Sequence, residues 1–287
     1  MTEVVAALVA FGTLFGLALI GIPLAAAMAL GGVAGMLAAG IPVIGAPIAV
    51  MGVLGNFAWL ALPLFIMLGG LLSQIGVSQG IVRFGEAVGR RLRGGTSQVV
   101  IVSSLFMGGM TGSTLSEAGM LSSMFRKDME KLGYPRGYLA GLISCAGLIG
   151  ALIPPSNILL ILGLAGQTSI LRLWIAGIVP GFLLGIGLMV VAALVHGRYD
   201  EVKTPGTATS GGSAPSVRST IGYALPGLAV PIFILGGMRF GVFSPVEAGA
   251  AGILFSLLLG LLLYRRDLSA SRLANGLSGD MLNAMGY

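Results

Sequence analysis

The chain alternates between long apolar runs and short polar or basic breaks. The longer apolar runs cover residues 4–20, 24–39, 58–75, 171–195, 221–238 and 245–264, and a short piece, read as interfacial, covers 47–57. Most of the longer runs approach the roughly 20 residues that a helix needs to cross a bilayer. Gly21 and Pro23 follow the first run, and Gly40 and Pro42 follow the second, as at helix ends. The pattern predicts an all-α, polytopic integral membrane protein.

Composition supports this class. Hydrophobic residues make up 56% of the chain and charged residues 9%, which is more apolar than a soluble core requires. The net charge of +6 is no sign of nucleic-acid binding, because Lys and Arg fall in short clusters between apolar runs and so encode orientation. Cys145 and His196 are the only residues of their types. An intramembrane enzyme would need more nucleophiles, bases or metal ligands, so we predict neither catalysis nor a cofactor.

Residues 77–94 differ from the spans because arginines alternate with apolar residues. At helical spacing, one face carries Ile81, Val82, Phe84, Val88 and Leu92. The opposite side carries Arg83, Glu86, Arg90, Arg91 and Arg93. This pattern predicts an amphipathic helix lying in the membrane interface. The excess of arginine places it on the cytoplasmic side.

Residues 96–125 form an apolar segment with a polar centre and basic flanks. The centre, 108–116, is rich in Gly, Ser and Thr, and a second basic cluster begins at Arg126. A single crossing would put its two ends in opposite compartments, yet both ends are basic. We therefore expect a re-entrant hairpin that enters from the cytoplasm, turns at membrane depth and returns. One long kinked helix with a local exception to the charge rule, or ordinary small-residue helix packing, also fits these residues.

Residues 138–167 form a further apolar segment interrupted by Pro154 and Pro155. Proline lacks a donor and restricts the residue before it, so two in a row predict two half-helices around an unwound segment. In hydrocarbon such a break is tolerated only where it is buried in protein or lines a cavity. The alternative is an ordinary kink or a loop at the membrane surface.

Charge clusters give one consistent path for the whole chain. Residues 1–198 form a first repeat, 199–219 a cytoplasmic linker rich in Gly, Ser, Thr and Pro, and 220–287 the start of a second repeat. The later order of span, span and interfacial segment (267–280) repeats the earlier one from the opposite side of the membrane. This pattern predicts an inverted-topology repeat whose second copy is incomplete.

Five short segments, in this order and topology, resemble one family. They are 109–114 (GMTGST), 131–135 (KLGYP), 153–156 (IPPS), 176–181 (AGIVPG) and 241–248 (GVFSPVEA). Together they are similar to the large membrane subunit of TRAP transporters, the tripartite ATP-independent periplasmic transporters. The resemblance extends from about Gly21 onwards. The family often has Ser where this chain has Thr111, so the hydroxyl is kept.

The resemblance implies an elevator-type, sodium-coupled symporter in a bacterial or archaeal inner membrane. Its partners would be a small membrane subunit and a periplasmic substrate-binding protein, and its cargo a small organic anion with a carboxylate, such as a C4-dicarboxylate. By motif, sodium and substrate would be held near two groups of residues: Thr111, Gly112, Ser113 and Thr114, and Pro154, Pro155, Ser156 and Asn157. These residues suit a hard cation, because unwound carbonyls and hydroxyls supply neutral oxygen ligands. Half-helix N-termini offer donors to a carboxylate.

Two other functions stay open at this point. One is an inverted-repeat anion or ion transporter that works without a binding protein. The other is a non-transporting, truncated scaffold, because the second repeat lacks the hairpin and broken helix that the family places there. We expect the sequence to be a fragment, the product of a broken gene, or one chain of a split subunit.

Overall fold

The computed structural model describes residues 2–75, 77–196 and 217–263, and these residues form helices and contain no strand. Three of the described helices are long and apolar enough to cross a membrane: Phe57–Gln74, Ile170–Val195 and Pro245–Leu262. The prediction of an all-α polytopic membrane protein is confirmed. Most of the predicted linker and the predicted interfacial segment at 267–280 lie outside the described residues. The chain divides into two compact units, Met1–Trp59 and Leu60–Tyr287.

The first unit is a helical hairpin followed by a short helix. Helices α1 (Thr2–Leu19) and α2 (Leu24–Ala38) pack against each other, and α3 (Gly45–Leu54) follows. Gly31 and Gly35 let the first two helices approach closely, because a Cβ at either position would lie 2.8 Å from an atom of Ala10. This is the small-residue contact typical of membrane helices. A 3-10 turn, η1 (Phe57–Leu60), leads out of the unit.

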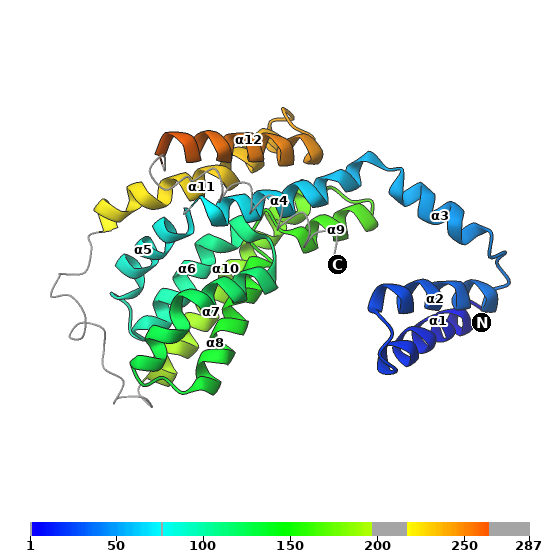
Figure 1. The fold of residues 1–287 in the computed structure, drawn as a ribbon, viewed down its shortest axis with the longest axis horizontal. Helices are drawn as coiled ribbons and strands as arrows, with labels where there is room; N and C mark the ends of the chain where they lie inside the picture. Colours follow the sequence, from blue (N-terminus) through cyan, green and yellow to red (C-terminus); the bar gives the residue numbers. More distant parts are fainter. Residues whose placement is uncertain (1, 76, 197–216, 264–287) are drawn as a thin grey trace. The chain divides into compact units, whose positions relative to one another are not determined.

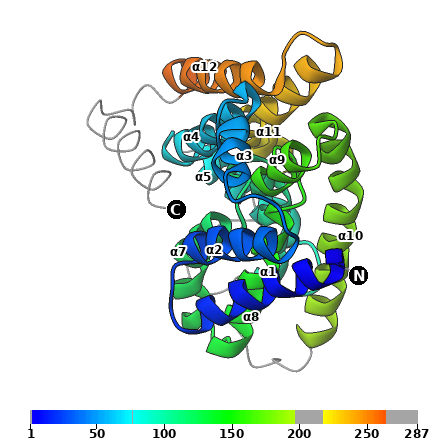
Figure 2. The ribbon, with the colours of Figure 1, turned by 90° about the vertical axis from the view of Figure 1, so that its right-hand side faces the viewer.

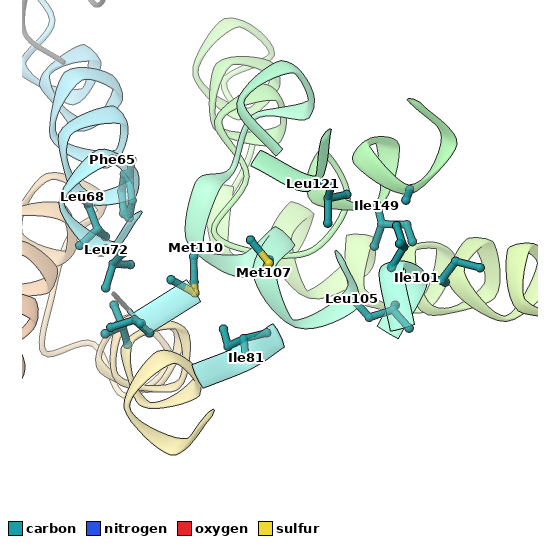
Figure 3. Close-up of a cluster of buried hydrophobic side chains, with 14 of the residues drawn as sticks. Phe65, Leu68, Leu72, Ile81, Ile101, Leu105, Met107, Met110, Leu121 and Ile149 are labelled. Atoms are coloured by element: carbon teal, nitrogen blue, oxygen red, sulfur yellow. The ribbon is translucent and has the colours of Figure 1, made fainter. Parts of the chain in front are cut away.

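The second unit is built around one buried helix. Helix α6 (Thr96–Thr111) packs against α4 (Ala61–Gln74), α5 (Val77–Gly89) and α7 (Thr114–Lys131). It also packs against α8 (Arg136–Gly150), α10 (Ile170–His196) and α11 (Val217–Arg239). Ile101 and Met107 of α6 are fully buried, and Figure 3 shows them within the apolar cluster that also holds Leu121 and Ile149. Because α6 is surrounded by protein, its C-terminal end is fixed in position.

The remaining helices surround this centre. Helices α7 and α8 lie side by side (Figure 1). Helix α10 runs along one edge of the unit, with α9 (Asn157–Ala165) beside its start (Figure 2). Helix α12 (Pro245–Leu263) packs on α4 and α11. Its first turn carries reciprocal capping bonds: the Ser244 amide donates to Glu247 Oε2 at 2.7 Å, and the Glu247 amide donates to Ser244 Oγ at 3.4 Å.

Helix α7 extends past the predicted end of the hairpin at residue 125 and stops at Lys131. The basic cluster that begins at Arg126 does not end the helix, because Arg and Lys are compatible with helical backbone. Gly133 ends it, with a φ of 92°. The Gly133 amide donates to Glu130 O and the Tyr134 amide to Met129 O, both at 3.1 Å. These two bonds satisfy the last carbonyls of the helix in a Schellman motif.

Helix α5 ends at Gly89, before the predicted residue 94, with Arg83 exposed and Glu86 half-buried, and its packed side differs from the predicted one. Of the five large apolar residues expected to form that side, only Ile81 is fully buried. Gly85 and Gly89 form much of the contact with α6, because a Cβ there would lie 2.2 Å from Ser103 Oγ and 2.6 Å from the Val99 amide nitrogen. Small residues therefore set the closest approach between α5 and α6.

Candidate functional site

Two residues reverse the chain between α6 and α7. Gly112 has a left-handed φ of 57°, and its amide donates to Gly108 O at 3.2 Å. Ser113 is extended and begins α7, and its side chain makes no capping hydrogen bond. Glycine suits the first position because a Cβ is strained in left-handed backbone. The turn joins the C-terminal end of one helix directly to the N-terminal end of the next.

A second break separates α8 from α9. Pro154, Pro155 and Ser156 are buried, and the peptide bond between the two prolines is cis. The Ser156 hydroxyl donates to Ala151 O at 2.6 Å and accepts from the Leu159 amide at 3.3 Å. Trp174 Nε1 donates to Ser156 O at 3.1 Å. Ser156 therefore caps α9 and fixes the proline segment against α10.

The two breaks touch. The Asn157 amide donates to Gly112 O at 3.0 Å. A Cβ on Gly112 would lie 2.6 Å from Pro155 O, and a Cβ on Gly109 would lie 2.7 Å from Pro154 O. Segments about forty residues apart thus meet backbone to backbone. We call residues 109–114 together with 154–157 the junction.

A groove of about 900 Å³ opens beside the junction. Its walls come from α4, from the hairpin turn with the start of α7, and from the start of α9. Its polar lining residues are Ser73, Ser113, Thr114, Ser116, Ser123 and Asn157. None of the described residues that line the groove has an ionisable side chain. The groove therefore presents neutral oxygens and amides beside apolar side chains such as Ile66 and Ile158.

The predicted site residues divide into two sets. Gly112, Ser113, Thr114 and Asn157 line the groove, whereas Pro154, Pro155 and Ser156 are buried behind it. The backbone of Thr111 closes α6, and its side chain lies outside the described residues. Whether these residues bind sodium or substrate stays a prediction.

Glu117 lies close to the junction and is fully buried. Its Oε1 is hydrogen-bonded to Ser104 Oγ, and the same Ser104 oxygen lies within hydrogen-bonding distance of Ala146 O, at 2.7 Å. A Cβ on Gly150 would lie 1.7 Å from Glu117 Oε2, so the carboxyl group occupies the space that glycine leaves free on α8. The sequence alone is equally compatible with a buried functional carboxylate and with a solvated carboxylate on the aqueous face of the hairpin. The burial of Glu117 shows that the solvated alternative is wrong, whereas a functional role stays a prediction.

The described residues contain no group of three or more His, Cys, Asp and Glu side chains that could hold a metal ion. A cation at the junction would therefore be bound by backbone carbonyls, hydroxyls and the Asn157 amide oxygen. The last turn of α6 provides carbonyls without an intrahelical partner, at the negative end of its dipole.

Residues 11–284 match the family described as the DctM component of tripartite ATP-independent periplasmic transporters. The sialic acid TRAP transporter large permease protein SiaM of Vibrio cholerae is 33% identical over 214 residues, which are 75% of this chain and 49% of that protein.

Two further relatives widen the comparison. The C4-dicarboxylate TRAP transporter large permease protein DctM of Pseudomonas aeruginosa is 32% identical over 73% of this chain and 48% of its own length. The isethionate TRAP transporter permease protein DctMQ of Oleidesulfovibrio alaskensis is 29% identical over 90% of this chain and 40% of its own length. The chain spans about half the length of SiaM and DctM.

Proposed function

We propose that this chain, which belongs to the DctM component family of tripartite ATP-independent periplasmic transporters, forms part of a permease that imports a small organic anion together with sodium. The observation that carries the proposal is the contact between the two breaks, from the Asn157 amide to Gly112 O. It creates a junction of irregular backbone beside an open groove. In transporters with discontinuous helices, such backbone is where ion and substrate bind.

The donor set fits sodium. The carbonyls at the end of α6 lie at the negative end of its dipole. Ser113 Oγ is not used as a helix cap, so its oxygen is available beside these carbonyls. Thr114 and Asn157 add further neutral oxygens in the groove. This arrangement binds a monovalent cation without placing a permanent negative charge in the membrane.

The start of α7 fits the anion. Thr114, Leu115 and Ser116 line the groove, and their amides belong to the first turn, where no intrahelical acceptor exists. Such a helix end favours negative charge. The named relatives refer to sialic acid, C4-dicarboxylate and isethionate, which carry a carboxylate or a sulfonate. Because the described lining has no cationic side chain, sodium at the adjacent end of α6 would supply the compensating charge and so couple the two solutes.

The family also supports the choice of partners and membrane. We propose a small membrane subunit, a periplasmic binding protein that delivers the anion, and a bacterial or archaeal inner membrane. One relative carries the composite name DctMQ. The chain itself supplies the apolar spans of a multi-pass membrane protein.

The test is uptake by the complete complex in proteoliposomes, with a sodium gradient and added binding protein. We expect uptake to require both the gradient and the binding protein. Ser113→Ala should raise the sodium concentration needed for half-maximal uptake and leave thermal stability nearly unchanged. Ser156→Ala is the contrast, because losing its cap should cost about 1 kcal/mol of stability. Sodium-independent uptake by the unaltered complex would refute the coupling, and uptake without binding protein would favour a transporter of another class.

A further inference from the structure

A second cavity, of about 490 Å³, lies between α7 and α8 and shares no residue with the groove. Arg126 and Glu130 line it from the last turns of α7, and Arg136 from the first turn of α8. Its wall continues along α8 with Leu139 and Ile143. The cavity thus has a charged end, where α7 ends and α8 begins, and an apolar wall that runs along α8.

The charged end has an excess of positive charge. Arg136 Nε lies 3.6 Å from Glu130 Oε1, so one carboxylate partly neutralises one guanidinium. Arg126 forms no ion pair with any residue of the described ranges. Both arginine side chains belong to exposed residues. A ligand with a negative headgroup would therefore meet two guanidinium groups and one competing carboxylate.

The apolar wall selects for an amphiphile. Leu139 and Ile143 line the cavity one helical turn apart but expose little surface, at 2% and 7%, and the exposed Ala140 between them adds to the apolar wall. Arg136 and Ser144 are two turns apart on the same helix, which is about 12 Å. A free inorganic anion would use only the arginine end. A lipid would use the arginine end with its phosphate and the wall with an acyl chain.

We propose that this cavity binds an anionic phospholipid, with its phosphate between Arg126 and Arg136 and an acyl chain along Leu139 and Ile143. Guanidinium groups match phosphate geometry in pairs of hydrogen bonds. Basic pockets between membrane helices on the cytoplasmic side are suited to such headgroups. The positive cluster at this end of α7 and α8 places the cavity at the cytoplasmic leaflet. The bound lipid would join the end of the hairpin to the broken helix.

The experiment measures lipid retention by native mass spectrometry. The protein is placed in phosphatidylcholine nanodiscs that contain increasing fractions of phosphatidylglycerol. The test variant is Arg126→Gln with Arg136→Gln. The matched control is Lys127→Gln with Lys131→Gln, which also removes two positive charges, here from the last turns of α7, where both lysines are exposed and neither lines the cavity.

We expect retention of phosphatidylglycerol by the arginine variant to fall by at least about tenfold, because the variant loses the charge-assisted contacts. The lysine control should change retention by about twofold or less, as expected for exposed charges. Melting temperature in pure phosphatidylcholine checks folding of all variants, and Arg126→Lys with Arg136→Lys should give an intermediate loss. Equal loss in the arginine variant and the lysine control would overturn the proposal. So would displacement of the lipid by millimolar inorganic phosphate, since the cavity would then bind free phosphate.

Discussion

Replacing Gly112 by alanine should force the hairpin turn away from the proline segment. Gly112 has a φ of 57°, and a residue with a Cβ pays about 1–2 kcal/mol in this left-handed region. The new methyl group would also lie 2.6 Å from Pro155 O, which is 0.4 Å inside the 3.0 Å limit that real Cβ atoms respect. Relieving this collision moves backbone that the hydrogen bond from Asn157 N to Gly112 O holds in place.

The cost of the left-handed backbone and the cost of the lost hydrogen bond can be added approximately. Losing one hydrogen bond costs about 0.5–1.5 kcal/mol, so Gly112→Ala should destabilise the closed junction by about 1.5–3.5 kcal/mol in total. That lowers the ratio of closed to open junction roughly 12- to 320-fold. We expect a lower melting temperature in lipid nanodiscs and a loss of the stabilisation that added sodium gives, because a disrupted site no longer favours the folded state by mass action.

Two glycines provide matched controls. Gly241 has a φ of 73°, and a Cβ added there would meet no atom within 4 Å, so Gly241→Ala carries the backbone strain without the collision. Gly141 lies within α8 with open space around it, so Gly141→Ala carries neither cost. If Gly112→Ala were no more destabilising than Gly241→Ala, the argument from close contact would be refuted. Unchanged sodium stabilisation in Gly112→Ala would separate the junction from the ion site.

Three further outcomes are expected. Glu117→Ala should cost about 1–3 kcal/mol in thermal unfolding, while Glu117→Gln, which keeps the shape, should cost less; equal losses would show that shape is not the main factor. Gly150→Ala should destabilise the protein, and less so in the Glu117→Ala background, because the colliding oxygen is gone; additive losses would contradict this contact. Burial raises the pKa of Tyr134 above 10.0, against a smaller lowering by its hydrogen bond with Ser97. The folded state thus favours the neutral phenol, and stability should be full below pH 10.0 and fall as pH rises through the raised pKa. Tyrosinate absorbance and alkaline melting curves, compared with Tyr134→Phe, test this; identical curves would disprove it.

Local chemistry made the two breaks predictable, but not their contact. Glycine at a turn and two prolines in a row interrupt a helix wherever they occur, so residues 112 and 154–155 mark the breaks in the sequence. The bond between Asn157 and Gly112 depends on how α8 packs against α6 and so places the proline segment, and no local pattern encodes it. The role of Ser156 follows from the same packing: its hydroxyl is used within the protein as a cap, while Ser113 faces the groove.

Burial of side chains was harder to predict than helix formation. Glu117 is buried because α7 turns that face toward α8, where Gly150 leaves room for a carboxyl group. Only the packing of Glu117 against Gly150 in three dimensions shows that the carboxyl group is buried and not exposed to solvent. For α5, large apolar residues indicated one face, whereas Gly85 and Gly89 make the close contact with α6. Hydrophobic periodicity gives little weight to glycine, although close helix packing depends on it.

The contact at the junction also limits how the protein can change shape. The hairpin turn and the proline segment share a backbone hydrogen bond and two close glycine contacts, and Trp174 fixes the segment to α10. A gate that opened by movement of the hairpin alone would have to break all the contacts between the hairpin turn and the proline segment at once. Conformational change is therefore expected to carry α6, α7, α8, α9 and the start of α10 as one rigid body, with the hinges in the segments that connect this body to the rest of the chain.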